Sequence, residues 1–510
     1  MAAIERPRNV VVVLLDSLNR HLIGPYGAAE LDTPNLDRLA ARSVRFDRHV
    51  TGSLPCMPAR HDLLTGSLDF LWRPWGSIEL WEEPVTHHLR RAGVTTMLVS
   101  DHPHLFETGG ENYHCEFTAW DYVRGHEGDP WRTCVDPSWV GAPDQPAPAQ
   151  AGWLRHPYDD SRTWFRDESD YPGPKTMAAA ADWLKRQAPS ADRYLLFVDE
   201  FDPHEPFDTP ARWAEMYDPD DSPRPIWPPY ATEATARGVI SPADLGRVRA
   251  AYGAKLSMID HHLGRLLDVL DRHGAWDDTA FVLCTDHGHY LGEHDIVGKP
   301  AAPLYDVMSR IPMLVAWPGL APARVDALTT TVDLHATLCD VFGVSPTHRT
   351  HGRSIVPLLD GSATSIREWA LMGIWGREVH VTDGRTKYAR APESINAPLS
   401  MWSNRWSTMP VHALPDVRLP KPDGRAFLDT MPGSGVPVIR QPFAAGDPVP
   451  FWAASRFTGN HLWDVDEDPD ETHDLAGADA RREREALDRL RAALDEVEAP
   501  DDQYARLGVA

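Results

Sequence analysis

Four short apolar runs, each followed at once by polar residues, constrain the fold of this chain more than any other feature. The runs are rich in β-branched residues and lack the alternation of half-exposed strands. Continuous apolar strands are typical of a mainly parallel sheet covered by helices, and ligands bind beyond the carboxyl ends of such strands. The sequence therefore predicts an α/β protein with a site at one sheet edge. The runs are Asn9–Leu15 before Asp16, Thr95–Val99 before Ser100–His104, Tyr194–Val198 before Asp199–His204, and Ala280–Thr285 before Asp286–His289.

Helix signals lie between these runs and weaken toward the C-terminus. Ser241 and Pro242 open a long apolar stripe that Gly274 closes, which predicts a helix packed on the sheet. After about residue 370, strand-like pieces at 379–388 and 461–465 replace the strand–helix alternation. We expect residues 1–370 to form the main α/β domain. Residues 371–510 are expected to form a smaller subdomain with a small sheet and a terminal helix.

The charge balance and the cysteine count exclude several classes of protein. The chain has 50 Lys and Arg against 75 Asp and Glu, a formal charge of −25, which argues against binding nucleic acid or an anionic membrane. Its longest apolar run, Val10–Leu15, is far shorter than the roughly 20 residues of a membrane-spanning helix. The N-terminus lacks the pattern of a signal peptide, and five cysteines without any Cys-x-x-Cys fit a reducing compartment. These observations predict a cytoplasmic protein.

One cysteine lies in a setting that favours chemistry. Cys56 stands where a loop meets the start of a short helix, and a helix N-terminus attracts anions through its free N–H groups. Arg60 follows one turn later and adds positive charge on the same face. Together they can hold a nucleophile beside an oxyanion. The alternative is that Cys56 is a buried thiol that only packs, which is the default for the other four cysteines.

The residues around Cys56 resemble the signature of a known family. Cys56-Met57-Pro58-Ala59-Arg60, followed by Leu63-Leu64-Thr65-Gly66, is similar to the motif of the type I sulfatases of the alkaline phosphatase superfamily. This resemblance implies a sandwich with a large, mainly parallel central sheet flanked by helices and a short antiparallel C-terminal sheet. It extends over nearly the whole chain, because other segments match in order: Pro25–Gly27, Thr33–Leu39, Asp286–Gly288, Leu291–His294, Gly298–Lys299 and Leu462–Thr472.

The resemblance implies a chemical role for Cys56. In this family a formylglycine-generating enzyme oxidises the motif cysteine to Cα-formylglycine, and the hydrated aldehyde is the nucleophile. One hydroxyl attacks sulfur, and loss of the other's proton then expels sulfate and restores the aldehyde. Arg60 would stabilise the developing negative charge.

The resemblance also implies a metal site and substrate contacts. Asp16, Asp286 and His287 match the family's metal positions, with the group derived from Cys56 as a further ligand. Such oxygen-rich ligation fits one divalent ion, Ca²⁺ or Mn²⁺, with Mg²⁺ as a further choice. His204 and Lys299 match the residues that contact the sulfate and the leaving oxygen, and either can be the general acid.

The sequence departs from the family pattern in three places, and two of these departures point to one branch. Ser17 follows Asp16 where many sulfatases have a second aspartate, and Asp286 is followed by His287 rather than Asn. Both features resemble the choline-sulfatase and phosphonate monoester hydrolase branch. The family's Gly-Lys-Trp-His segment is absent, and residues 100–104 occupy its place. His104 in that segment is the predicted substrate contact, with His102 as the alternative.

We therefore predict a sulfuric ester hydrolase that acts on a small-molecule or sugar sulfate. The alternative in the same class is a phosphonate monoester or phosphodiester hydrolase, because those esters carry the same single charge. A further alternative is a member that binds an anion without hydrolysing it. Proline-rich stretches at 129–174 and 392–450 are expected to be irregular, and with the loops at 402–429 they would shape the pocket. A homo-oligomer is possible.

Overall fold

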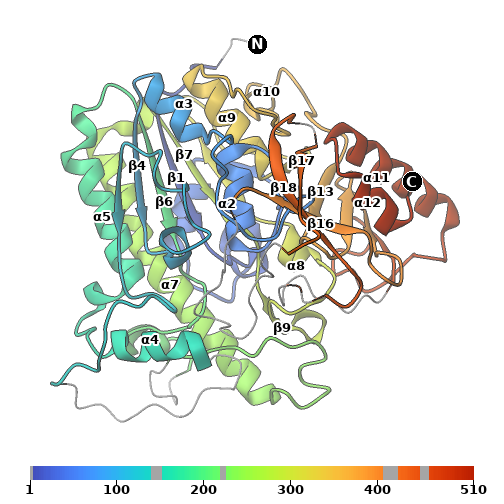
Figure 1. The fold of residues 1–510 in the computed structure, drawn as a ribbon. Coiled ribbons are helices and arrows are strands. Elements are labelled where there is room, and N and C mark those ends of the chain that lie inside the picture. The colour runs from blue at the N-terminus through green and yellow to red at the C-terminus, as the bar shows by residue number, and fades with distance from the viewer. Residues whose placement is uncertain are drawn as a thin grey trace.

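A large mixed sheet forms the centre of the molecule (Figure 1). The computed structural model describes residues 4–138, 152–218, 225–405, 423–432, 434–447, 449 and 459–509. All pairs in the eight-stranded sheet are parallel except those that β10 makes with β2 and β7. The sheet order is β11 (Ala323–Val325), β2 (Val44–Phe46), β10 (Met313–Ala316), β7 (Thr279–Cys284), β1 (Asn9–Leu15), β6 (Tyr194–Glu200), β4 (Thr95–Ser100) and β5 (Ala119–Tyr122). The predicted α/β class is confirmed.

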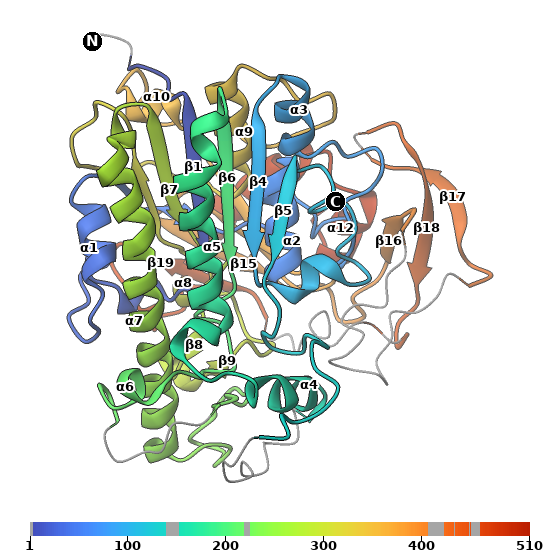
Figure 2. The same ribbon diagram turned by 90° about the vertical axis from the view of Figure 1, so that its left-hand side faces the viewer.

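Helices cover both faces of this sheet, as the continuous apolar strands predict. Every residue of β1 is buried, and alternate residues pack in opposite directions. Val11 and Val13 pack with α1 (Pro34–Ala40), α5 (Pro172–Arg186) and α7 (Pro242–His273). Val10 and Val12 pack with the other layer, which contains α2 (Cys56–Thr65), α3 (Val85–Arg91) and α9 (Val332–Phe342). Figure 2 shows α5 and α7 in front of the strands, with α2 and α9 behind them.

The longest helix, α7, has the limits that the sequence predicts. The side chain of Ser241 accepts a hydrogen bond from Asp244 N, and Pro242 occupies the first turn. Gly274 ends the helix in a left-handed conformation with φ of 61°. Its apolar stripe is buried against the sheet, but Lys255 lies within the buried part.

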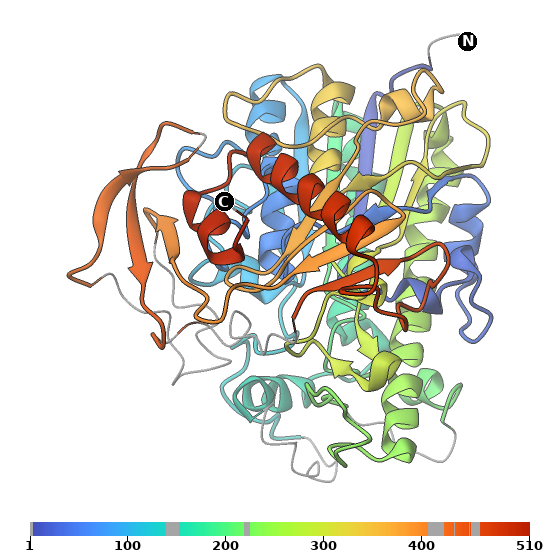
Figure 3. The same ribbon diagram turned by 90° about the vertical axis from the view of Figure 1, so that its right-hand side faces the viewer.

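The C-terminal part adds two antiparallel sheets (Figure 3). The segment 379–388, predicted as one strand-like piece, is a hairpin, because Gly384 at φ of 93° turns the chain between its two strands. The four-stranded sheet runs β13 (Ala370–Gly373), β14 (Val379–Thr382), β15 (Thr386–Arg390), β19 (His461–Asp464), and α11 (Ala480–Glu496) packs on it. The three-stranded sheet, which sequence reasoning missed, runs β16 (Leu399–Ser403), β18 (Pro437–Phe443), β17 (Phe427–Thr430).

Short elements complete the described fold. They are the strands β3 (His49–Val50), β8 (Tyr290–Leu291), β9 (Val297–Gly298) and β12 (Thr329–Thr330), and the helices α4 (Gly152–Arg162), α6 (Ala211–Ala214), α8 (Asp306–Ser309), α10 (Val356–Leu359) and α12 (Asp501–Leu507). Because β13 begins at Ala370, the second sheet starts beside the predicted limit of the main domain; that partition stays a prediction. Parts of the predicted pocket-shaping stretches, 139–151, 406–422, 433, 448 and 450, lie outside the described residues. Within the described ranges, no helix has both the length and the apolar character needed to cross a membrane.

Candidate active site

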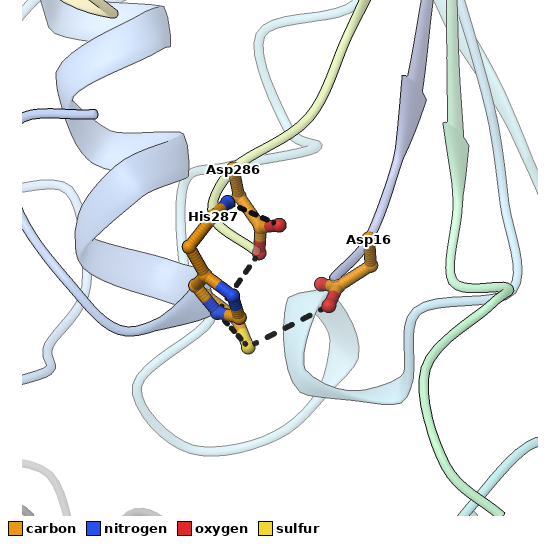
Figure 4. A group of neighbouring side chains, drawn as sticks. Asp16, Asp286 and His287 are labelled. Carbon is orange, nitrogen blue, oxygen red and sulfur yellow. Dashed lines mark hydrogen bonds and ion pairs between the residues drawn. The ribbon is translucent and has the colours of Figure 1, made fainter. Parts of the chain in front are cut away.

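Side chains from two strand ends and one helix start meet at the carboxyl edge of the central sheet (Figure 4). Asp16 follows β1, Asp286 and His287 lie just beyond β7, and Cys56 is the first residue of α2. All four are buried, and their ligand atoms lie within 4.8 Å of one another. The Cys56 Sγ atom lies 3.3 Å from His287 Nε2 and 3.9 Å from Asp16 Oδ1. The structure thus brings together the four residues that the sequence analysis predicts as metal ligands.

Neighbouring groups orient these side chains. His287 Nδ1 lies 2.8 Å from Gly288 O, so Nδ1 donates a hydrogen bond and Nε2 keeps its lone pair toward the cluster. Ser17 donates from its backbone N to Asp286 Oδ1 at 3.0 Å and from its hydroxyl to Asp16 Oδ1 at 2.8 Å. Its φ of 62° is a strained conformation for a serine, of a kind that clusters at functional sites. Ser17 therefore fixes both carboxylates, although it supplies no ligand carboxylate of its own.

The electrostatics of the cluster suit a cation. Burial and the nearby Asp286 carboxylate raise the pKa of Asp16 well above its usual value. Burial also acts on Asp286, but His287 and Arg60 hold the pKa of that carboxyl below its usual value. Burial lowers the pKa of His287 to about 4, so its imidazole is neutral at neutral pH. Two close carboxylates and a neutral imidazole match the donors that a divalent ion takes, and such an ion would relieve the repulsion between the carboxylates.

Arg60 connects this cluster to a third strand. Its guanidinium lies 2.9 Å from Asp16 Oδ2 and 3.0 Å from Asp286 Oδ2, and it makes a two-pronged ion pair with Asp199 at 2.6 and 2.8 Å. Asp199 belongs to β6 and lies opposite Leu14, whose side chain packs on the α2 side of the sheet. Sequence reasoning missed Asp199 as a site residue. The signal was present, since the polar stretch after the third apolar run begins at this residue.

Lys299 and His204 form a hydrogen-bonded pair beside the cluster. Lys299 Nζ lies 2.6 Å from His204 Nε2 and 3.3 Å from the Ser17 hydroxyl. His204 Nδ1 lies 2.8 Å from Glu205 O and donates to it, so Nε2 accepts from Lys299. Burial lowers the pKa of His204 well below its usual value, whereas Glu205 and the other nearby acids raise the pKa of Lys299 despite burial. The shared proton therefore belongs to Lys299.

Glu205 is a second residue that sequence reasoning missed. Its carboxylate lies 3.5 Å from Lys299 Nζ and 3.2 Å from His289 Nε2, and it accepts a hydrogen bond from the Tyr230 hydroxyl. Burial works to raise the pKa of Glu205, but His204 and Lys299 hold it well below its usual value. Glu205 thus keeps a negative charge beside the lysine. In the sequence, only its position next to His204 indicates a role for Glu205.

The two histidines that follow β4 have different surroundings. The His104 ring faces Glu107 through Nδ1 and lies 3.2 Å from Glu127 Oε2 through Nε2. Burial opposes its charge, yet these carboxylates raise the pKa of His104 to about 10, so it is an imidazolium. His102 is fully buried, its Nε2 lies 3.8 Å from Asp16 Oδ2, and neither ring nitrogen has a hydrogen-bond partner among the described residues. His102, rather than His104, is the one beside the cluster.

Comparison with known proteins assigns this arrangement to a family. A family model described as Sulfatase matches residues 8–344. A choline-sulfatase of Rhizobium meliloti is 28% identical over 434 residues, which cover 76% of this chain and 79% of that protein. An arylsulfatase of Clostridium perfringens is 24% identical over 398 residues, which cover 71% of this chain and 80% of that protein.

A solved structure has the same fold. The phosphonate monoester hydrolase of Agrobacterium radiobacter superposes with a TM-score of 0.64 over 96% of this chain and 95% of its own. Its sequence identity is 21%, so this similarity concerns the fold.

Proposed function

This chain belongs to the sulfatase family, and we propose that it hydrolyses sulfuric esters with the side chains gathered around Cys56. The observation that carries the proposal is the convergence of Asp16, Cys56, Asp286 and His287 at the carboxyl edge of the sheet, with Arg60 paired to both carboxylates. The curated relatives named choline-sulfatase and arylsulfatase support the same reaction class.

We propose that these four positions hold one divalent ion, Ca²⁺ or Mn²⁺, with Mg²⁺ as a further choice. The donor set supports this, since two carboxylates and the lone pair of His287 Nε2 face one another in a buried site. When bound, the ion would neutralise substrate oxygens and lower the pKa of the nucleophile. Arg60 remains beside it and is held by Asp199 on the opposite side.

Position 56 is proposed to carry Cα-formylglycine, made from Cys56 by a formylglycine-generating enzyme. In the unmodified chain, burial and Asp16 raise the pKa of the Cys56 thiol well above its usual value. A neutral thiol is a poor nucleophile, whereas the hydrated aldehyde supplies both a nucleophilic hydroxyl and a route for sulfate release. Arg60, which donates to Cys56 O at 3.1 Å, is held against this position.

The proposed proton donor to the leaving oxygen is Lys299. Its ammonium points at the unprotonated Nε2 of His204, and Glu205 keeps it charged. His204 would receive a hydrogen bond from Lys299 and orient it toward the leaving group. For the sulfate itself we propose His102 as a contact, because its ring is buried beside Asp16 and neither ring nitrogen has a hydrogen-bond partner in the described part of the chain. The contact predicted for His104 stays a prediction, since both its nitrogens face carboxylates.

A phosphonate monoester or phosphodiester hydrolase is the second candidate. The charges near Cys56 favour a singly charged ester, because Asp16, Asp199, Asp286 and Glu205 outnumber Arg60 and Lys299 and a divalent ion would only balance them. A phosphate monoester dianion fits such a site poorly, whereas sulfate monoesters and phosphodiesters carry one charge each. The substrate is proposed to be a small-molecule or sugar sulfate, and the site of action the cytoplasm.

Parallel turnover of an aryl sulfate, an aryl phosphodiester and a phenylphosphonate monoester tests the proposal. The protein is made beside a formylglycine-generating enzyme and loaded with Ca²⁺ or Mn²⁺. We expect kcat/KM to be highest for the sulfate. Negligible sulfatase activity together with turnover of either phosphorus ester would favour the second candidate over the first. If metal-loaded protein that carries formylglycine turns over none of the three esters, hydrolysis is contradicted.

A further inference from the structure

Lys255 is a buried cation in the middle of the long helix α7. Its side chain is 3% exposed and lies among the apolar residues that pack against the sheet. Burying an ammonium is costly unless it is paired and hydrogen-bonded, so its position requires an explanation. We propose that Lys255 is a positioning residue that holds the loop carrying His204 in its reactive geometry. This inference rests on the proposed sulfatase function.

The Lys255 ammonium binds the backbone on both sides of Glu205. Its Nζ donates to His204 O at 2.9 Å and to Pro206 O at 2.6 Å. Between these two carbonyls lies Glu205 O, which accepts the hydrogen bond from His204 Nδ1. Lys255 therefore fixes the carbonyl groups of His204 and Pro206, which flank the Glu205 carbonyl that orients the His204 ring. Through that ring it also sets where Nε2 meets Lys299.

Asp202 supplies the counter-charge that makes this arrangement stable. Its Oδ1 lies 2.6 Å from Lys255 Nζ and 2.7 Å from His126 Nε2. Burial works to raise the pKa of Asp202, but Lys255 and His126 hold it below its usual value, so the pair is ionic. The ion pair offsets the desolvation of the ammonium, and the remaining donors of Lys255 are free to bind the two carbonyls.

A purely structural lysine would anchor α7 to the loop and affect only stability. If Lys255 positions His204, its replacement should also affect catalysis. Its loss should act on the step in which the leaving oxygen receives a proton, and it should act through His204. Misplacing a reactive group by about 1 Å can cost on the order of 10²-fold in rate.

The test uses the metal-loaded, formylglycine-containing enzyme and two substrates, phenyl sulfate and para-nitrophenyl sulfate. Lys255→Met should lower kcat for phenyl sulfate, which has the poorer leaving group, by about 10²-fold with KM within about threefold. The loss for para-nitrophenyl sulfate should be at least about fivefold smaller, because that leaving group needs less proton transfer. Equal losses for the two substrates would overturn the inference.

A double-mutant cycle tests whether Lys255 acts through His204. In a His204→Ala background, Lys255→Met should lower kcat by less than about threefold, because the ring it positions is gone. An undiminished loss in that background would overturn the inference. If the wild-type enzyme itself turns over neither sulfate, the proposed function fails instead, so the two failures are distinguishable.

Two further variants separate positioning from folding. Lys255→Met/Asp202→Asn removes the buried carboxylate that the single variant would leave without the lysine ammonium, and it should fold and show the same kcat loss. Asp260→Asn is the matched control, because Asp260 is also buried in α7 but accepts hydrogen bonds from Leu36 N and Asn35 N, away from the site. It should lower the melting temperature and leave kcat within about twofold of wild type. A fully folded double variant with wild-type kcat would contradict the role of Lys255.

Discussion

Two buried arginines, Arg60 in α2 and Arg73 in the segment that follows it, each meet three carboxylates, and only Arg60 belongs to the proposed active site. The Cys56 cluster (Asp16, Cys56, Arg60, Asp199, Asp286 and His287) lies at the start of α2. The Arg73 cluster (His61, Asp69, Arg73, Glu79 and Glu82) begins in the same helix and continues into the segment after it. Composition alone does not distinguish them.

The clusters differ in how their charges are balanced. Arg73 lies 2.6 Å from Asp69, 3.1 Å from Glu79 and 2.8 Å from Glu82. The Ser403 hydroxyl, at the end of β16, and the backbone N of Asn404 donate two further hydrogen bonds to Glu79. Burial opposes charge on His61, but Asp69 and Glu82 raise the pKa of its imidazole above the usual value. In the Cys56 cluster the histidine is neutral and points a lone pair at two carboxylates. The Cys56 cluster is therefore marked by an imidazole lone pair and carboxylates that converge on one point.

The largest effect should come from the nucleophile position. Cys56→Ala should lower kcat by about 10⁴-fold or more, as loss of a nucleophile does in other hydrolases. The free energy of unfolding should change by less than about 2 kcal/mol, because the side chain is small. Steady-state kinetics and urea unfolding measure the two quantities. A stability loss beyond that limit would favour the packing interpretation of Cys56.

The Arg73 cluster should give the opposite result. Arg73→Met leaves buried carboxylates without their main counter-charge and should cost about 3–5 kcal/mol of unfolding free energy. The rate per folded molecule should remain within about threefold of wild type, since the cluster holds no group of the proposed site. Urea unfolding, combined with kinetics corrected for the folded fraction, checks this. A 10²-fold loss of kcat in folded protein would erase the distinction between the clusters.

Removal of the metal should affect one cluster only. Exhaustive chelation should abolish turnover and lower the stability by about 3 kcal/mol relative to protein with the ion at 100 times its Kd. Addition of Ca²⁺ or Mn²⁺ should restore both turnover and stability. The Arg73→Met variant should show the same gain in stability as wild type when the metal is added. Asp286→Asn should show almost none, which thermal unfolding with and without the ion would reveal. An equal metal increment in Asp286→Asn would contradict the ligand assignment.

The effect that is smallest over a single pH unit concerns His104, which lies near the Cys56 cluster but is paired with carboxylates, as Arg73 is. Its pKa is raised from 6.5 to about 10 by Glu107 and Glu127, although burial opposes this. Its contribution to stability is thus fully present below pH 6.5 and is lost as the pH rises toward 10. Between these limits wild-type stability should fall by up to about 1.4 kcal/mol per pH unit relative to His104→Gln. If the unfolding free energies of wild type and His104→Gln differ by the same amount at pH 7.5 and at pH 8.5, His104 is not an imidazolium.

The sequence predicts four neighbouring strands of the central sheet, β7, β1, β6 and β4, because they are buried on both faces and therefore read as unbroken apolar runs. Helix α7 has similarly clear limits at Ser241 and Gly274. The three-stranded sheet was missed because it lies in a proline-rich stretch, and because β17 and β18 are partly exposed and contain no continuous apolar run. In this three-stranded sheet, β16 pairs with β18, which lies far away in the sequence, and no local pattern reveals such pairing.

The candidate site divides in the same way. Asp16, Asp286 and His287 stand where polar residues follow apolar runs, and the motif around Cys56 identifies the family. Asp199 begins the polar stretch after the third apolar run, but nothing in that stretch indicates which residue pairs with Arg60. Lys255 could not be singled out, because a lone charged residue in a helix usually faces solvent. Their importance arises from contacts with residues about 50 to 140 positions away in the sequence.

The central claim is that Cys56 is converted to the nucleophile of a sulfatase. Mass spectrometry of the tryptic peptide that contains position 56, from protein made beside a formylglycine-generating enzyme, tests it most directly. The account predicts a peptide that lacks the thiol, resists alkylation and reacts with a hydrazide probe, in proportion to the sulfatase activity of the sample. A peptide of full mass with an alkylatable thiol, in a sample that hydrolyses sulfate esters, would contradict it.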